Sequence, residues 1–217
     1  MKCIIFDCDG LMFDSERISI EVWTRICKEH GMELDEEFII GITGATAESA
    51  TAQFNRFPGV YPLLDDIREK RHDQIMYEAE HGGIAKKGLV ELLDYLTENH
   101  YVFCIASSSN ITYVNRLLAT LPKDYPFAVK MTGDQITHGK PNPEIFLKAA
   151  QQAKVDPKDC LVLEDSRQGI LAAHAAGMKA GFVQDCIIKD EIIEHHMSMQ
   201  FDNLAGFIDY LENQKDA

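Results

Sequence analysis

Short apolar runs alternate with longer amphipathic stretches over most of the chain. The apolar runs have the length of buried strands and lie at residues 2–6, 102–106, about 127–131, 160–163 and 179–183. The amphipathic stretches have apolar residues at helical spacing and lie at residues 87–99, 110–121, 143–154 and 166–176. Because strands that alternate with helices form a parallel sheet covered on both faces, the pattern predicts an α/β fold with a doubly wound, Rossmann-like core.

Capping residues support the predicted helix boundaries. Asn110 and Ser166 precede their helices as N-caps, while Asn142 and Pro143 supply a cap and a first-turn proline. Gly177 follows the last apolar residue of the fourth amphipathic stretch, where a left-handed helix terminus is common. These local signals and the periodicity predict the same helices.

The alternation of strands and helices is interrupted after the first strand. From residue 15 to about residue 80 the apolar positions follow a helical spacing, and glycines break the pattern at 41–44 and 82–83. An insert of this size indicates a separate small unit, with a cleft between it and the core where ligands commonly bind. We therefore predict an α/β core formed by residues 1–14 and 82–217 and a helical cap domain formed by residues 15–81.

Charge and cysteine usage restrict the partners and the compartment. The formal net charge of −14 argues against nucleic acid or an anionic membrane as a partner, so an anionic ligand needs local attraction from a metal or a few cations. The N-terminal residues contain no apolar stretch long enough for a signal peptide or a membrane span. No CxxC pair occurs, and Cys3, Cys104 and Cys160 lie in strand-like runs as buried free thiols. We expect a cytoplasmic protein; its oligomeric state is not predicted, and a monomer is compatible with the sequence.

Polar side chains gather where the predicted strands end. Asp7 and Asp9 follow the first strand, 107–109 is a serine triplet after the second, Lys140 follows the third, and 164–165 is an acidic pair after the fourth. Since ligands of open α/β sheets bind at the carboxyl ends of the strands, we expect these groups to face one crevice. The acids suit a hard divalent cation, and the hydroxyl, amide and ammonium groups suit an oxyanion.

This combination of groups suits phosphoryl transfer through a carboxylate. A carboxylate can approach phosphorus only when the charge of the phosphate oxygens is neutralised, which Mg²⁺ and a lysine can do. A second acid two residues further on, Asp9, could protonate the leaving alkoxide and later deprotonate water. The strand ends therefore predict a small phosphorylated metabolite as the ligand.

Four segments carry a resemblance to a known family. They are DCDGLMFDSE at 7–16, SSSN at 107–110, GKPNPEIF at 139–146 and LEDSRQGILAAHAAGM at 163–178. In order and spacing they resemble the motifs of the haloacid-dehalogenase-like superfamily, and more narrowly its branch of β-phosphoglucomutase-like and phosphoglycolate-phosphatase-like enzymes with a helical cap. True haloacid dehalogenases lack the second acid, because a halide leaving group needs no proton, so Asp9 disfavours that activity.

The resemblance implies a role for each matching residue. Asp7 would form a phospho-aspartyl intermediate, and Asp9 would act as the general acid and base. The residues expected to bind the transferring phosphate are Ser107, Ser108 and Lys140. The groups expected to hold Mg²⁺ are the side chains of Asp7 and Asp165, the backbone carbonyl of Asp9, and Glu164 directly or through water.

Substrate selection is expected to depend on residues at the cap and the cleft. The candidates are Glu16, Thr43, Arg71 and Asn110. For Glu16 a solvated acid in a first helical turn is an equally good interpretation, and the basic run around Arg71 is most often a solvated helix face. Asp14 is interpreted as a structural hinge or cap residue that bonds backbone amides near Ser15.

Three functions follow from this set of residues. Water attacks the phospho-aspartate in a phosphatase, whereas a phosphomutase passes the phosphoryl group to a second sugar hydroxyl. Hexose-phosphate mutases of the resembled branch carry an arginine in the early cap loop, and the stretch at 41–48 contains neither arginine nor lysine. We therefore favour a Mg²⁺-dependent phosphatase over a β-phosphoglucomutase-type mutase. A non-enzymatic phospho-acceptor domain is disfavoured by the helical insert and by Asp9, since such a domain protonates no alkoxide.

Overall fold

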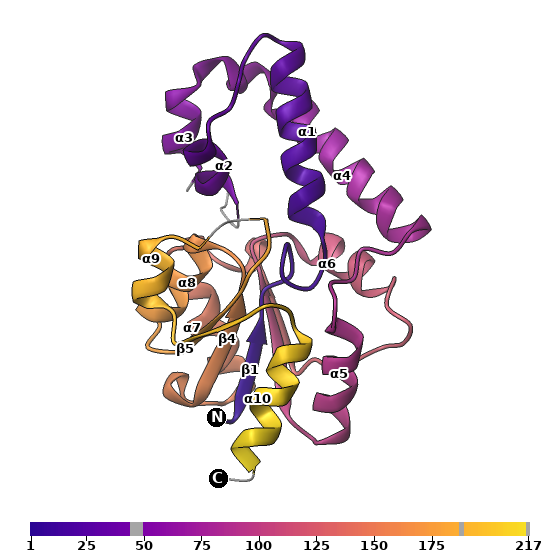
Figure 1. Cartoon of the computed structure of the whole chain (residues 1–217), viewed down its shortest axis with the longest axis vertical. Coiled ribbons are helices and arrows are strands. Elements are labelled where there is room, and N and C mark those ends of the chain that lie inside the picture. The colour runs from indigo at the N-terminus through magenta and orange to yellow at the C-terminus, as the bar shows by residue number, and fades with distance from the viewer. Residues whose placement is uncertain (44–49, 187–188, 216–217) are drawn as a thin grey trace.

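The computed structural model describes residues 1–43, 50–186 and 189–215 (Figure 1). Within these residues the core is a six-stranded parallel sheet with the order β3-β2-β1-β4-β5-β6. The strands are β1 (Cys3–Phe6), β2 (Val102–Ser107), β3 (Val129–Thr132), β4 (Cys160–Glu164), β5 (Lys179–Val183) and β6 (Met199–Phe201). The chain order reverses at β1 and β4, which is the switch point where doubly wound sheets bind ligands. The predicted fold class is confirmed.

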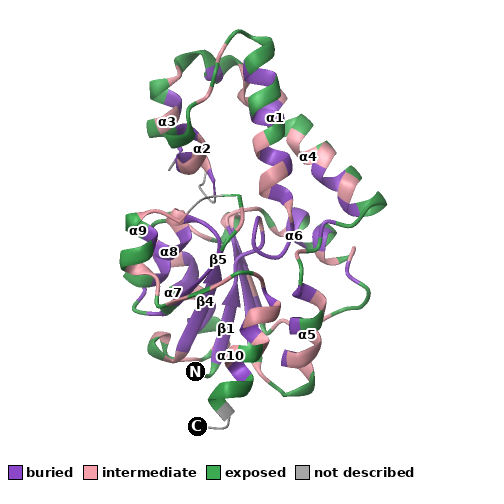
Figure 2. Ribbon diagram, in the orientation of Figure 1, coloured by how far each residue is buried: buried purple, intermediate pink, exposed green. Residues whose placement is uncertain are grey.

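Helices cover both faces of the sheet (Figure 2). The helices that follow β1 in the core are α5 (Leu89–Glu98), α6 (Ile111–Leu118), α7 (Glu144–Ala153), α8 (Arg167–Ala175), α9 (Glu191–His196) and α10 (Ala205–Lys215). Ile4 and Phe6 of β1 pack with the apolar faces of α5, α6 and α10, while Cys3 and Ile5 pack with those of α7, α8 and α9. Alternate strand residues point to opposite faces, so a strand buried on both sides must be apolar throughout, as β1 is.

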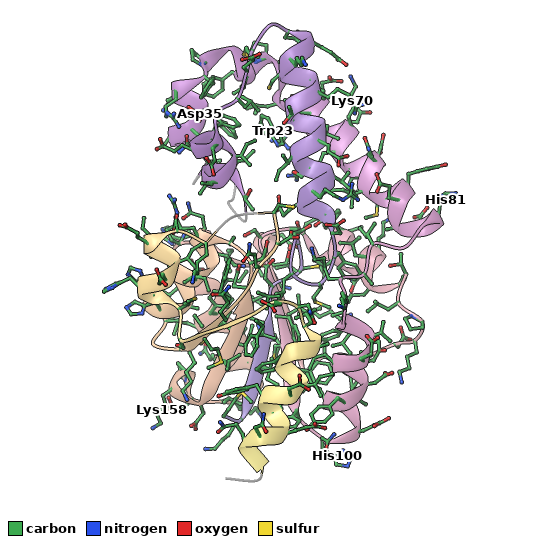
Figure 3. All side chains as sticks on the ribbon, viewed as in Figure 1. Trp23, Asp35, Lys70, His81, His100 and Lys158 are labelled. Carbon is green, nitrogen blue, oxygen red and sulfur yellow. The ribbon has the colours of Figure 1, made fainter. Side chains whose placement is uncertain are left out.

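A helical unit lies over the carboxyl ends of the strands (Figure 1). It consists of α1 (Ser15–Glu29), α2 (Glu36–Ile42), α3 (Thr51–Arg56), the 3₁₀ helix η1 (Pro58–Leu63) and α4 (Leu64–His81). Trp23 packs edge-on against Phe38 at 5.5 Å and stacks on Phe54 at 5.9 Å between ring centroids, so the unit has an apolar core of its own. Lys158 and His100 mark the opposite end of the sheet in Figure 3, where β4 and β2 begin.

Two chain segments connect the helical unit to the core. The backbone N–H of Asp14 donates to Ile84 O at 2.8 Å, and that of Lys86 donates to Met12 O at 2.9 Å. The two crossings are therefore paired side by side, as a double hinge requires. This arrangement is compatible with the predicted division into core and cap, whose boundaries stay a prediction.

Most predicted elements agree with the structure, and three were missed. The side chains of Asn110 and Ser166 cap α6 and α8, and Gly177 has the predicted positive φ, at 70°. Helix α7 begins one residue later than predicted, with Pro143 at the N-cap position and the Asn142 side chain accepting from the N–H of Glu144 at 3.0 Å. Strand β6 and helices α9 and α10 were not predicted; β6 is a short, partly exposed edge strand without an apolar run.

Candidate active site

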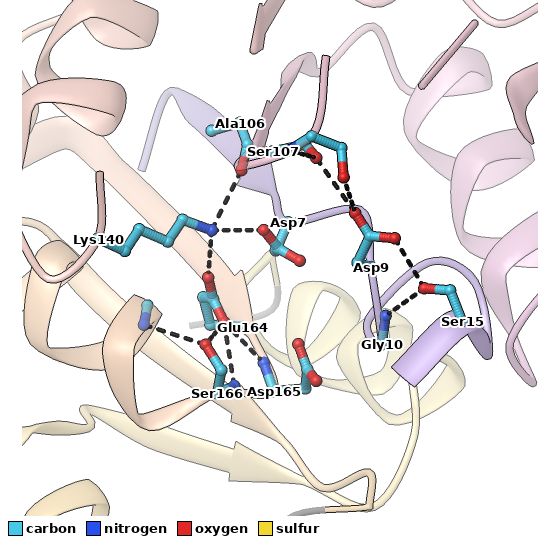
Figure 4. Close-up of polar contacts among 12 residues, drawn as sticks. Asp7, Asp9, Gly10, Ser15, Ala106, Ser107, Lys140, Glu164, Asp165 and Ser166 are labelled. Carbon is cyan, nitrogen blue, oxygen red and sulfur yellow. Dashed lines mark hydrogen bonds and ion pairs between the residues drawn. The ribbon is translucent and has the colours of Figure 1, made fainter. Parts of the chain in front are cut away.

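The carboxyl ends of β1, β2 and β4 bring distant parts of the chain together (Figure 4). Asp7 directly follows β1, and its N–H donates to Leu163 O at 3.1 Å, which extends the pairing with β4. Ser107 and Glu164 are the last residues of β2 and β4. Lys140 reaches the same place from the loop before α7. The structure thus assembles these residues as expected, while their chemical roles stay predictions.

Lys140 is a fully buried cation between two carboxylates. Its Nζ donates to Glu164 Oε1 at 2.6 Å and Ala106 O at 3.3 Å, and it forms an ion pair with Asp7 Oδ1. Burial alone lowers the pKa of Lys140, but the charges of Asp7 and Glu164 outweigh burial and raise that pKa above its usual value. The ammonium group therefore remains charged at the centre of the site.

Glu164 is held on both of its oxygens. Oε1 accepts from Lys140, while Oε2 accepts from the N–H groups of Asp165 and Ser166, both at 3.1 Å, and from Ser166 Oγ at 2.9 Å. A Cβ at Gly169 would lie 1.8 Å from Glu164 Oε1, so only glycine leaves room for this carboxylate. This environment explains how Glu164 positions Lys140. Whether Glu164 also holds a metal stays a prediction.

Asp165 has the opposite environment. Both of its carboxylate oxygens are buried and lack a hydrogen-bond partner within the part of the chain that the structure describes. Burial raises the pKa of Asp165 well above its usual value, and the nearby charges of Glu164 and Asp7 raise it further. Gly10, with a φ of 82°, provides the space, because a Cβ there would lie 2.1 Å from Asp165 Oδ2. Such an unpaired buried carboxylate is costly unless a cation neutralises it.

These acids fit a hard divalent cation. One ligand atom each of Asp7, Glu164 and Asp165 lies within 4.8 Å of the others, and all three residues are buried. Burial and Glu164 raise the pKa of Asp7, against the opposing effect of Lys140. Three carboxylates face a single ammonium, so the site has a surplus of negative charge that a divalent cation with oxygen ligands would balance.

A second cluster of acidic residues lies at the hinge, and nearby cations balance its negative charge. Asp14, Asp185 and Cys186 also bring ligand atoms within 4.8 Å of one another. However, Lys86 Nζ pairs with Asp185 Oδ1 and lies 3.5 Å from Asp14 Oδ1, and Arg17 Nε binds Asp14 Oδ2 at 2.6 Å. The prediction that the Asp14 side chain bonds backbone amides near Ser15 is wrong. This side chain makes no cap hydrogen bond and forms these ion pairs instead.

Asp9 is half-buried and is surrounded by hydroxyl groups. Its oxygens accept from Ser15 Oγ at 2.8 Å, Tyr113 OH at 2.9 Å, Ser109 Oγ at 2.8 Å and Ser107 Oγ at 3.4 Å. Burial, followed by the charge of Asp9, raises the pKa of Tyr113 well above its usual value. Sequence reasoning missed Ser15 and Tyr113 and included Ser109 only as part of the serine triplet, since no local pattern links these residues to Asp9.

A cleft of about 890 Å³ lies between the core and the helical unit, and it is lined by all but one of the remaining candidates. Glu16, Arg71, Ser108 and Asn110 line this cleft with Asp7 and Asp9. Asn110 also caps α6 through its side chain, and Arg71 donates to Ser19 Oγ at 3.4 Å. Thr43 is buried at the end of α2, donates to Ile39 O at 2.9 Å, and is missing among the described residues that line the cleft. Its position therefore gives no support to contact with substrate.

Fold and site together define a doubly wound α/β enzyme with an acidic centre beneath a helical unit. The family model of haloacid dehalogenase-like hydrolases matches residues 4–183, and the chain belongs to this family. YhcW of Bacillus subtilis is 32% identical over 99% of both chains, and validoxylamine A 7′-phosphate phosphatase of Streptomyces hygroscopicus subsp. limoneus is 29% identical over 82% of this chain and 83% of its own. The β-phosphoglucomutase structure from Clostridium difficile shares the fold, with a TM-score of 0.78 and 19% identity over 100% of this chain and 97% of that chain. The predicted family and the enzyme class, a phosphomonoester hydrolase, are confirmed.

Proposed function

We propose that this protein is a Mg²⁺-dependent phosphatase that hydrolyses a small phosphomonoester through a phospho-aspartyl intermediate on Asp7. The observation that carries the proposal is the buried ion pair of Asp7 and Lys140 next to the carboxylate of Asp165, which has no hydrogen-bond partner in the described part of the chain. An anionic nucleophile, a fixed cation and a vacant pair of acidic oxygens are what phosphate ester cleavage through a carboxylate requires. Mg²⁺, held by Asp7, Asp165 and the Asp9 carbonyl, would neutralise charge between Asp7 and the phosphate.

The chain's own residues account for both chemical steps. Lys140 holds Oδ1 of Asp7, so we assign the attack on phosphorus to Oδ2. As the new O–P bond forms, the ester P–O bond breaks and Asp9 gives its proton to the leaving oxygen, which departs as an alcohol. Asp9 then takes a proton from water while the water oxygen attacks phosphorus, and Asp7 and inorganic phosphate are released. Ser107, the Ser108 amide and Lys140 would bind the phosphate oxygens.

The helical unit of residues 15–81 would select the substrate. It contributes Glu16 and Arg71 to the cleft lining, and Asn110 faces them from the core. Because the catalytic groups lie on the core and most of the specificity candidates lie on this unit, one chemistry can serve different phosphorylated metabolites. Within the described residues, no helix is long and apolar enough to cross a membrane.

A phosphomutase of the β-phosphoglucomutase type is the alternative function. The prediction against it relies on the absence of arginine and lysine from residues 41–48, of which 44–48 lie outside the described residues. The third hypothesis, a non-enzymatic phospho-acceptor domain, is disfavoured further because the chain belongs to a hydrolase family.

A screen of phosphorylated metabolites with Mg²⁺ tests the proposed reaction. We expect at least one sugar phosphate or similar monoester to yield inorganic phosphate and the free alcohol in equal amounts, with the two products measured separately. Interconversion of sugar monophosphates with little free phosphate would instead establish the mutase. Asp124→Asn, a substitution at an exposed position, should retain full activity in the same screen.

The response of stability to Mg²⁺ should depend on pH. The folded-state pKa of Asp165 is raised, so the folded protein binds more protons than the unfolded chain, and the metal-free protein loses stability as pH rises through that pKa. Since Mg²⁺ needs the ionised carboxylate, saturating Mg²⁺ should stabilise the fold by about 2–3 kcal/mol above the raised pKa of Asp165 and by progressively less as pH falls below it. Thermal unfolding with and without Mg²⁺ over a range of pH measures this dependence. Asp165→Asn should remove the Mg²⁺ effect; an unchanged effect in that variant would contradict the assigned ligand.

A further inference from the structure

Three short hydrogen bonds hold the carboxylate of Asp9, and they come from three separate elements. Ser15 is the first residue of α1, Ser109 lies in the turn after β2, and Tyr113 belongs to α6. Tyr113 and Ser15 bind Oδ1 at 2.9 and 2.8 Å, and Ser109 binds Oδ2 at 2.8 Å. Asp9 itself is only half-buried, so its orientation depends on these donors and not on packing alone.

Tyr113 differs from the two serines in its rigidity. A serine hydroxyl rotates freely to follow a moving acceptor, whereas a tyrosine hydroxyl lies at the end of a planar ring fixed by two torsions. The Tyr113 side chain is 8% exposed, and its backbone N–H is fixed by the Asn110 cap at 2.9 Å. It is therefore the donor best able to define one position for the carboxylate.

The helical unit also contacts this tyrosine. The ring of His72 on α4 lies 5.6 Å from that of Tyr113, and His72 Nε2 lies 3.2 Å from Arg116 NH1 on α6. Tyr113 consequently stands between the helical unit and Asp9. A group in this place can transmit the position of the helical unit to the acid that contacts the substrate.

We propose that Tyr113 is a positioning residue that holds Asp9 in the orientation for proton transfer to the leaving oxygen. This inference rests on the proposed function, in which Asp9 is the general acid. Without the Tyr113 hydroxyl, Oδ1 of Asp9 keeps the Ser15 contact, and Oδ2 keeps those of Ser109 and Ser107. These serine hydroxyls can rotate with the carboxyl group, so they do not stop it from turning away from the ester oxygen. Attack by Asp7 on phosphorus does not use Tyr113, so only the proton transfer should suffer.

Phenyl phosphate and p-nitrophenyl phosphate are esters of similar size, and comparing their rates distinguishes a positioning role of Tyr113 from a merely structural one. p-Nitrophenolate leaves readily without a proton, whereas phenolate is more basic and depends more on a general acid. For Tyr113→Phe we expect kcat/KM on phenyl phosphate to fall about 10- to 100-fold, a scale typical of a misplaced catalytic group. This ratio reports the steps up to cleavage of the ester, and so it excludes the later hydrolysis of phospho-Asp7, which is common to both esters. The fall on p-nitrophenyl phosphate should be at least several-fold smaller. Any loss of folded protein lowers both rates equally and cancels in their ratio.

Tyr125→Phe is the matched control. Tyr125 OH donates to Asp94 Oδ1 at 2.9 Å, the same length and type of bond, and neither residue lines the cleft. This variant should keep the wild-type ratio of the two rates. An equal fall of kcat/KM for both esters in Tyr113→Phe, or no fall for either, would overturn the inference. Full turnover in Asp7→Asn would instead contradict the proposed function. The proposed role of Tyr113 would then be contradicted too, because it rests on that function.

Discussion

Replacing Asp7 by asparagine is expected to abolish turnover while leaving the protein folded. An amide oxygen is a poor nucleophile, and loss of a covalent nucleophile lowers kcat by a factor on the order of 10⁴ or more. The amide is nearly isosteric with the carboxylate, so the packing of β1 against β4 is retained. Phosphate release and thermal unfolding measured on the same preparation test both parts.

The charges of the site predict the direction of the stability change in this variant. Asp7 lies close to Glu164 and Asp165, and all three are buried. Among the described residues, Lys140 is the single cation that pairs with any of them, and it pairs with Asp7 and Glu164. Removing one of three carboxylates reduces the surplus of negative charge, so the metal-free variant should be at least as stable as the wild type. Undiminished phosphate release would rule out Asp7 as the nucleophile, and Asp124→Asn serves as the control for an aspartate-to-asparagine change.

Replacing Lys140 by alanine is expected to have the largest effect on stability. The substitution leaves Asp7 and Glu164 buried without their counter-ion, and breaking such a pair costs about 3–5 kcal/mol. The rate should also fall by about 10²-fold or more, because a preorganised cation next to the phosphate is lost. Urea unfolding at neutral pH and steady-state kinetics measure the two losses.

The stability lost in Lys140→Ala should depend on pH. The raised pKa of Lys140 means that its contribution is fully present below the pKa of a free lysine and is lost only in strongly alkaline solution. The difference in the free energy of unfolding between the wild type and Lys140→Ala should become smaller as pH falls, because protonated carboxyl groups need no counter-ion. Lys148→Ala is the control: its partly exposed pair with Glu144 on α7 should contribute at most about 1 kcal/mol. A Lys140→Ala protein as stable as this control would contradict the proposed importance of the buried pair.

Sequence reasoning was most successful where the signal is local. Apolar runs predicted the strands from β1 to β5, because a strand buried on both faces must be apolar at nearly every position. It failed at β6 and α9, which are short and partly exposed and so carry little periodicity, and it also missed the longer helix α10. Asp14 shows the same limit on a smaller scale, since its partners Arg17 and Lys86 come from two different segments.

By itself the sequence determined the fold class, the family and the set of acids and cation at the strand ends. It could do so because each apolar run and the polar residues that follow it are adjacent along the chain, so both can be read from a short segment. Only the tertiary structure decided the pairing of these groups: Lys140 with Asp7 across 133 positions, and Tyr113 with Asp9 across 104. It also left Asp165 without a hydrogen-bond partner among the described residues, while Glu164 is held on both oxygens. Burial and distance create these differences between similar carboxylates, and neither quantity is encoded by residue type alone.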